Sequence, residues 1–114
     1  MSFQLPFLKE KTWTKCDVFE KLKAGHLKNV DQRKAGCMII RKTNMSVEFV
    51  KMWYETCCNY KLLDDSPSIC PNDPSFKENR HDQSIFSILC GKYNIKYIKN
   101  ETANCQDTEK PILV

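Results

Sequence analysis

Glycine is scarce in this sequence, and its scarcity excludes the common phosphate-binding loops. Three of the 114 residues are glycine, and neither a GxGxxG nor a GxxxxGKS/T run occurs. Both loops need glycine to bring backbone N–H groups close to a phosphate. The chain also has no Asp-x-Asp motif, no C-x-x-C pair and only two histidines, so the sequence predicts no metal ligands.

Long apolar runs are absent as well. The N-terminal "MSFQLPFLKEK" has no sustained apolar segment of the kind found in secretory signals or membrane spans. The sequence therefore predicts no membrane segment and, by default, a cytoplasmic location. The net charge of +4 comes from basic residues that are scattered rather than gathered in a stripe, so we expect no nucleic-acid partner.

Cysteine, in contrast, is abundant, with seven in the chain. An odd number without metal-ligand spacing indicates reduced thiols that serve as small buried hydrophobic side chains. We do not expect the adjacent Cys57 and Cys58 to bridge each other. If the chain belonged to a longer secreted or lumenal protein, some cysteines could pair, and the sequence leaves this alternative open.

Length and periodicity predict one α/β domain over residues 1–114. Apolar residues at helical spacing predict helices over 14–22, 44–63 and 82–93. A capping box of Thr14 and Asp17 would open the first helix, and Gly91 would help to end the last. Short apolar or alternating runs predict strands at 37–42 and 95–99, and polar stretches predict loops at 23–36 and 64–80. Two short strands make a poor sheet by themselves.

The turn before the last predicted helix has an unusual concentration of polar side chains: Arg80, His81, Asp82 and Gln83. Asp82 could simply cap the helix by accepting hydrogen bonds from its free amides, and His81 alone could be an ordinary loop histidine. Together, however, the four side chains offer a carboxylate, an imidazole, an amide and a cation. Such a set suits a ligand that carries several hydroxyl or phosphate groups.

A second polar cluster, "EKTWTKCDVF", lies at residues 10–19. Trp13 could pack against the start of a helix while Lys11 and Lys15 are solvated. Alternatively, Trp13 could stack on a sugar ring while Lys15 neutralises an anion, with Asp17 nearby. Neither cluster contains a recognisable nucleophile–base pair, so the residues alone do not identify a reaction.

Three segments, in this order, resemble the C-terminal half of nucleotide-diphospho-sugar glycosyltransferases with a GT-A-type fold: "KEKTWTKCDVFEKL", "CMIIRKTNMSVEFVKMWYETCCNYKLLDD" and "FKENRHDQSIFSILCGKY". The resemblance covers residues 7–98, and H-D-Q-S is its most specific element. It implies a partial GT-A-like fold, with helices on a few short strands and without the nucleotide-binding half. Asn79 stands where the family pattern has its first histidine.

The resemblance implies that Asp82 is the catalytic residue, beside the acceptor hydroxyl, whose proton it would accept. It implies substrate-binding roles for Arg80, His81, Gln83, Trp13, Lys15 and Asp17. The partners it implies are a nucleotide-sugar donor, a glycan or other hydroxyl acceptor, and a missing N-terminal half.

The complete family fold also implies Mn²⁺ or Mg²⁺, held by an Asp-x-Asp motif that this chain lacks. The chain would therefore be truncated and inactive alone. The alternatives are a non-catalytic interaction module derived from that fold, or a small cysteine-rich domain whose thiols bind metal or pair.

Overall fold

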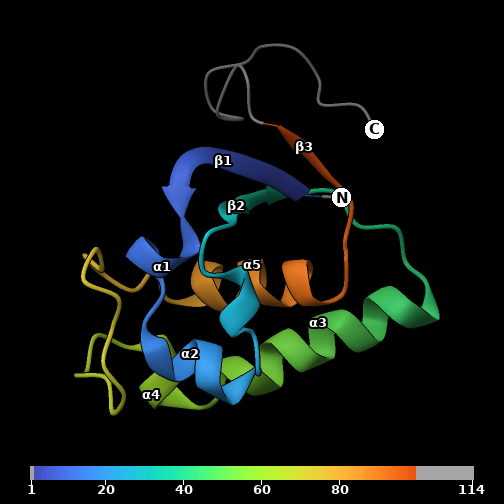
Figure 1. Ribbon diagram of the computed structural model, residues 1–114. Helices are drawn as coiled ribbons and strands as arrows, with labels where there is room; N and C mark the ends of the chain where they lie inside the picture. Colours follow the sequence, from blue (N-terminus) through green and yellow to red (C-terminus); the bar gives the residue numbers. More distant parts are fainter. Residues whose placement is uncertain (1, 100–114) are drawn as a thin grey trace.

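Three strands form a mixed sheet along one side of the molecule in the computed structural model, which describes residues 2–99 (Figure 1). β1 (Ser2–Lys9) is central, antiparallel to β2 (Asp31–Met38) and parallel to β3 (Tyr97–Lys99). The pairing of β1 with β2 shifts register twice. The expectation of an α/β domain is confirmed at this level.

The helices are α1 (Glu10–Trp13), α2 (Cys16–Lys21), α3 (Asn44–Cys57), α4 (Tyr60–Leu63) and α5 (Asp82–Lys92), with a 3₁₀ turn, η1 (Gly25–Leu27). In Figure 1, α5 lies beneath the sheet and α3 lies on the other side of α5. Among residues 2–99, no helix combines the length and apolar character needed to span a bilayer.

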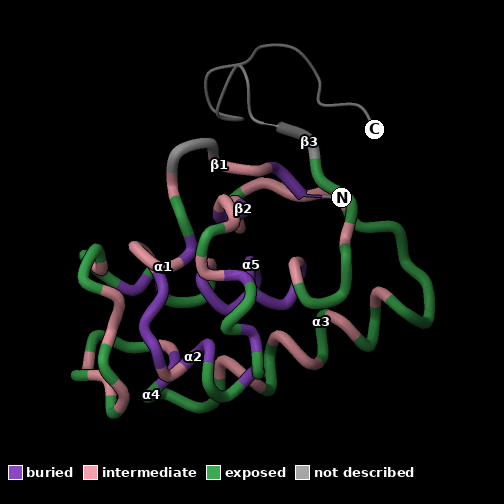
Figure 2. The backbone as a smooth tube through the Cα atoms, in the orientation of Figure 1, coloured by how far each residue is buried: buried purple, intermediate pink, exposed green. Residues whose placement is uncertain are grey.

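The core forms around α5, which is the most buried helix (Figure 2). Every residue from Ser84 to Cys90 is buried, because the helix has the sheet on one side and other helices on the other. The core consists of Val18, Phe19, Leu22, Ala24, Leu27, Leu62, Ile85, Ile88 and Leu89. In contrast, α3 has no buried residue and contributes only half-buried side chains such as Phe49 and Trp53, which pack on Phe86. The α3 layer is therefore held by one face only.

Two of the three strands differ from the prediction. Residues 2–9 form β1, a strand that no sequence pattern predicted, and β2 lies mostly within the expected loop 23–36 instead of at 37–42. The side chains of β2 are largely polar, and their polar groups are satisfied by bonds to neighbouring elements, as those of Gln32 and Arg33 are. A search for periodic apolar residues cannot reveal such a strand. The strand expected at 95–99 is confirmed as β3, over its last three residues.

The helix predictions agree better with the structure than the strand predictions do. α2 and α5 match their expected ranges, whereas the expected helix 44–63 is interrupted at Cys58 and Asn59 and continues as α4. The predicted capping box of α2 is wrong: its N-cap is Lys15, and no side chain caps it. α3 does have a capping box, made by Thr43 and Ser46.

A disulfide joins Cys16 at the start of α2 to Cys70 in the long segment before α5. The expectation that the cysteines are reduced is therefore wrong for this pair. The two residues are 54 positions apart, and the fold brings their Cα atoms to 5.7 Å, a normal separation for a disulfide. Cys57 and Cys58 are free, as expected.

Candidate functional site

The turn that opens α5 is held by hydrogen bonds to α1. The Ser84 hydroxyl accepts from the Arg80 amide at 2.8 Å and donates to the Trp13 carbonyl at 2.6 Å. The Arg80 amide also donates to that carbonyl, at 3.1 Å. These bonds fix the backbone from which the polar side chains of residues 80–83 project.

His81 is the N-cap of α5 and has φ 54° and ψ −123°. This conformation costs a non-glycine residue about 1–3 kcal/mol, and such strain concentrates at functional sites. Its imidazole Nε2 lies 2.8 Å from the Asp65 carboxylate, and both side chains are more than half exposed. The strained backbone therefore presents the His81 side chain to solvent beside a carboxylate.

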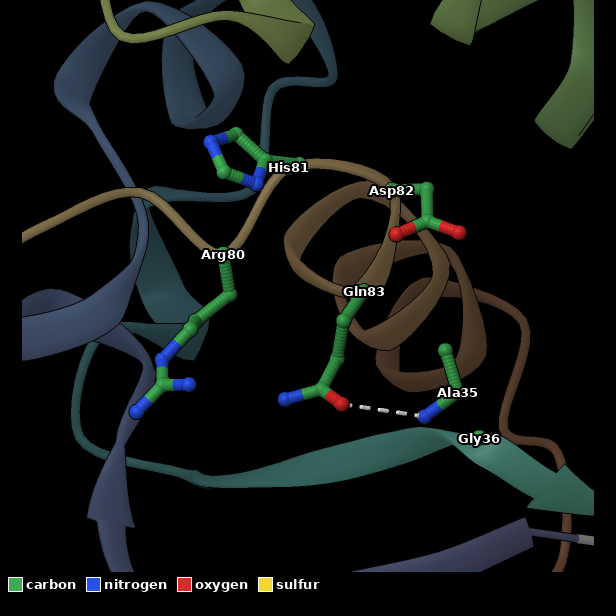
Figure 3. Close-up of a pocket in the computed structure, with 6 residues that line it drawn as sticks. All are labelled: Ala35, Gly36, Arg80, His81, Asp82 and Gln83. Carbon is green, nitrogen blue, oxygen red and sulfur yellow. Dashed lines mark hydrogen bonds between the residues drawn. The ribbon is translucent and has the colours of Figure 1, made fainter.

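The turn faces β2 across a pocket of about 310 Å³ (Figure 3). Six residues line the pocket: Ala35, Gly36, Arg80, His81, Asp82 and Gln83. Figure 3 shows Arg80 and Gln83 extending toward β2, whereas His81 projects from the opposite side of the turn. The four polar residues singled out from the sequence all line the pocket, but their side chains do not all point into it, and β2 supplies two small residues that the sequence did not indicate.

Asp82 is the first residue of α5, where the partial positive charge of the helix terminus favours a carboxylate. Its side chain is exposed and, within the described residues, makes no hydrogen bond or ion pair. Only its backbone carbonyl is used, as the acceptor for Trp53 Nε1 at 3.1 Å. The capping role expected for its side chain is therefore wrong, and the carboxylate is open to a ligand.

Gln83 differs from Asp82, because both ends of its amide are bonded within the protein. Its Oε1 accepts from the Ala35 amide at 3.2 Å, which is the dashed line in Figure 3, and its Nε2 donates to Gln32 Oε1 at 2.9 Å. Gln83 is thus a fixed part of the pocket wall that joins α5 to β2.

The two sequence clusters meet at Trp13. The Arg80 guanidinium lies over the Trp13 ring, 4.5 Å from its centroid, and Lys77 Nζ lies 5.8 Å from it. Glu78 is 3.5 Å from Arg80 Nε on the exposed surface. Trp13 therefore borders the site by supporting Arg80, which lines the pocket.

Lys15 and Asp17, in contrast, are not among the residues that line the pocket. Lys15 is 1% exposed and donates to the Asp64 carboxylate and to Ser66. The Asp17 carboxylate accepts from the backbone amides of Ile69 and Cys70 at 3.0–3.2 Å. Both side chains hold the segment before α5, and neither lies against the pocket beside Asp82.

The sequence missed a buried carboxylate beneath the pocket. Glu10 is 2% exposed, and its oxygens accept hydrogen bonds from Gln32, Thr14 and Ser87. Burial raises the pKa of Glu10 to about 7, against the lowering effect of these hydrogen bonds and of Arg33. Glu10 stands in the quoted "EKTWTK" segment, but only the fold shows that its side chain points inward.

The described residues do not fit a divalent metal of the kind the family resemblance implies. The one group of three close metal-ligating side chains among residues 2–99 is Cys16, Glu20 and Cys70, and its two cysteines form the disulfide. Mn²⁺ and Mg²⁺ prefer oxygen ligands, and that group offers only one carboxylate, from Glu20. Asp64 is engaged by Ser66 and Lys15.

Comparisons with family models, with curated proteins and with solved structures found no match to this chain.

Proposed function

We propose that this chain forms the acceptor-side wall of a glycosyltransferase site, at which a sugar passes from a nucleotide-sugar donor to an acceptor hydroxyl. The observation that carries the proposal is the pocket at the start of α5, which is lined by Asp82, with its unpaired carboxylate, and by Arg80, His81 and Gln83. These groups can bind hydroxyl and phosphate oxygens, and the pocket has the size class of a small ligand site.

In the proposed reaction, the acceptor oxygen forms a bond to the anomeric carbon of the donor sugar. The bond from that carbon to the diphosphate breaks, and the nucleoside diphosphate leaves with the electron pair. Asp82 takes the hydroxyl proton as general base. Arg80 contributes positive charge near the anionic side of the donor, and Gln83 keeps the wall in place. The nucleotide-binding half comes from outside the described residues.

A second function is favoured by a different observation. An apolar groove of about 1020 Å³ runs between α3, the end of β2 and the end of α5, and is lined by residues such as Met38, Ile40, Met45, Phe49 and Ile95. Met45 is 84% exposed. Apolar patches of this kind commonly mark contact surfaces, which fits a non-catalytic interaction module. The transferase requires the pocket at the start of α5 to bind a sugar or a nucleotide sugar, whereas the interaction module does not. A binding experiment therefore distinguishes the two functions.

The decisive experiment is a titration of the ¹⁵N-labelled chain with glucose, galactose, UDP-glucose and UDP-galactose, followed by NMR chemical shifts. The proposal expects shift changes confined to residues 80–83 and to Ala35 and Gly36. Gly36→Leu should abolish them, because a Cβ on Gly36 meets nothing within 4 Å and a larger side chain can grow beside the pocket without disturbing the fold.

Gly25→Leu is the matched control, since Gly25 is also exposed with open space around it and lies in η1, away from the pocket. Asp82→Asn should weaken the binding of the same probes about tenfold or more, because a charge-assisted hydrogen bond becomes a neutral one. If none of the four probes changes any shift in the pocket, the transferase proposal is wrong and the interaction module is favoured.

A further inference from the structure

A line of hydrogen bonds runs from the pocket wall to the interior. The Ala35 amide donates to Gln83 Oε1, Gln83 Nε2 donates to Gln32 Oε1, and Gln32 Nε2 donates to Glu10 Oε1 at 3.1 Å. We call these four groups the buried amide chain. It connects β2, α5 and α1, and Gln32 at its centre is fully buried.

The direction of the buried amide chain is fixed at its outer end. A backbone N–H can only donate, so Gln83 must present its oxygen to Ala35 and its NH₂ to Gln32. Gln32 must then present its own NH₂ to Glu10. The arrangement therefore requires an acceptor at Glu10 Oε1, and an ionised carboxylate is the strongest acceptor that can occupy this position.

The groups around Glu10 are otherwise neutral donors. Ser87 on α5 donates to Oε2 at 2.5 Å while accepting from the Arg33 amide, and Thr14 at the end of α1 donates to Oε1. Arg33 on β2 is the charged residue that acts on Glu10; its guanidinium bonds the Ile95 carbonyl and lies over Tyr97. Glu10 is thus held by oriented hydrogen bonds, of which the one from Ser87 is short, but has no ion-pair partner among the described residues.

We propose that Glu10 is a positioning residue for the pocket: ionised Glu10 fixes Gln32 and, through it, the Gln83 wall, and protonation of Glu10 loosens that wall. A proton on Oε1 would set a donor against the NH₂ of Gln32, and a proton on Oε2 would replace the charge-assisted bond to Gln32 by a weaker neutral one. In either case Gln83 is held less firmly against β2. That this wall serves a ligand rests on the function proposed above.

The midpoint of such a change falls in the physiological range. Burial raises the pKa of Glu10 to about 7, so the carboxyl is mostly protonated at pH 6 and mostly ionised at pH 8. The pocket wall should therefore be better ordered at the higher pH.

The test is an NMR titration of the full chain between pH 5 and pH 8.5, without ligand. The side-chain NH₂ signals of Gln83 and Gln32 are assigned by their loss in Gln83→Leu and Gln32→Leu. The proposal expects these signals to shift with one common midpoint near pH 7, together with the carboxyl ¹³C signal of Glu10. Glu10→Gln should remove this pH dependence, and Glu20→Gln, an exposed change of the same charge, should leave it intact.

The proposal is overturned if the Gln83 signals stay constant while Glu10 titrates, or if their midpoint persists in Glu10→Gln. Should Glu10→Gln not fold, the titration of the unmodified chain and of Gln32→Leu decides the matter, because Gln32→Leu must uncouple Gln83 from Glu10. For any sugar probe that binds, affinity should be about fivefold weaker at pH 5.5 than at pH 8, the effect of one weakened hydrogen bond. A failure of the sugar probes alone would contradict the proposed function and leave the NMR result standing.

Discussion

His81 shows at the scale of one residue how a candidate site differs from the rest of the chain. Its positive φ is unfavourable for a side chain with a Cβ, and no hydrogen bond from its side chain caps the helix. The conformation nevertheless persists because the bonds of Ser84 to Arg80 and Trp13 hold the turn from both sides. The strained residue lies within the turn whose residues line the pocket.

His81→Gly should raise the free energy of unfolding by about 1 kcal/mol, since glycine adopts this conformation without a Cβ penalty. The loss of the exposed contact with Asp65 offsets little of this gain. Urea unfolding measures the change. His26→Gly is the control, because His26 is exposed and has no positive φ, and it should not stabilise the protein. A destabilised His81→Gly would show that the turn is not strained.

Residues that are neighbours along the chain can be recognised as a group from the sequence. Arg80, His81, Asp82 and Gln83 are adjacent, so the sequence alone could indicate that they share a site. The contacts of Lys15 and Asp17 cannot be recognised in this way, because their partners at Asp64 and at Ile69 are about 50 positions away. No local pattern distinguishes a charged side chain that binds a ligand from one that binds a distant loop.

At the scale of elements, the long segment between α4 and α5 is fixed rather than free. The Cys16–Cys70 disulfide, the Asp17 carboxylate and the Asn72 side chain, which accepts from the Cys16 amide at 2.7 Å, all attach it to α2. Asn79 attaches its end to Lys15 and to the carbonyl of Leu62. These attachments fix the position of the turn that opens α5.

The double variant Cys16→Ser/Cys70→Ser should lower the free energy of unfolding by about 2–4 kcal/mol, because the disulfide closes a long loop of the unfolded chain. Urea unfolding under non-reducing conditions measures the loss, and Cys57→Ser, at a free cysteine, is the matched control. Equal stability of the double variant and the unmodified chain would mean that the pair does not form in solution.

Gly91 illustrates the limit of element-scale prediction. Gly91 lies near the end of α5, as the sequence predicts, but it is followed by Lys92 as the last helical residue and is not the C-cap, which is Tyr93. A Cβ at Gly91 would come within 3.0 Å of Leu27, so glycine permits close packing of η1 on α5. The same residue type signals both roles in a sequence, and only the neighbouring element tells them apart.

At the scale of the whole molecule, buried and exposed carboxyls oppose each other in the pH dependence of stability. The folded pKa of Glu10, about 7, lies above its ordinary value of 4.5. The contribution of Glu10 to the free energy of unfolding is therefore complete below about pH 4.5. It is lost as the pH rises to 7, which lowers the free energy of unfolding by about 3 kcal/mol. Hydrogen bonds from Ser66 and Ser75 lower the pKa of Asp64 and of Asp73, whose contributions are lost as the pH falls below 3.8.

The free energy of unfolding should consequently be greatest near pH 4–5 and decline toward pH 7. Urea unfolding from pH 3 to pH 8 measures this profile. Glu10→Gln should flatten the decline between pH 4.5 and pH 7, and Glu20→Gln should not. A stability that is constant or rises over that interval would contradict a buried Glu10 with a raised pKa.

The sequence by itself determined the α/β class, the approximate position of α2, α3 and α5, and the polar turn at the start of α5. These features depend on contacts between residues close in the chain, which periodicity and capping patterns record. Tertiary structure alone decided that residues 2–9 and 31–38 are strands, that Cys16 pairs with Cys70, and that Glu10 lies buried beneath the pocket. Each of these depends on partners far along the chain, and the physical reason is the same in every case. A polar strand, a thiol or a carboxylate acquires its role from the groups that folding places around it.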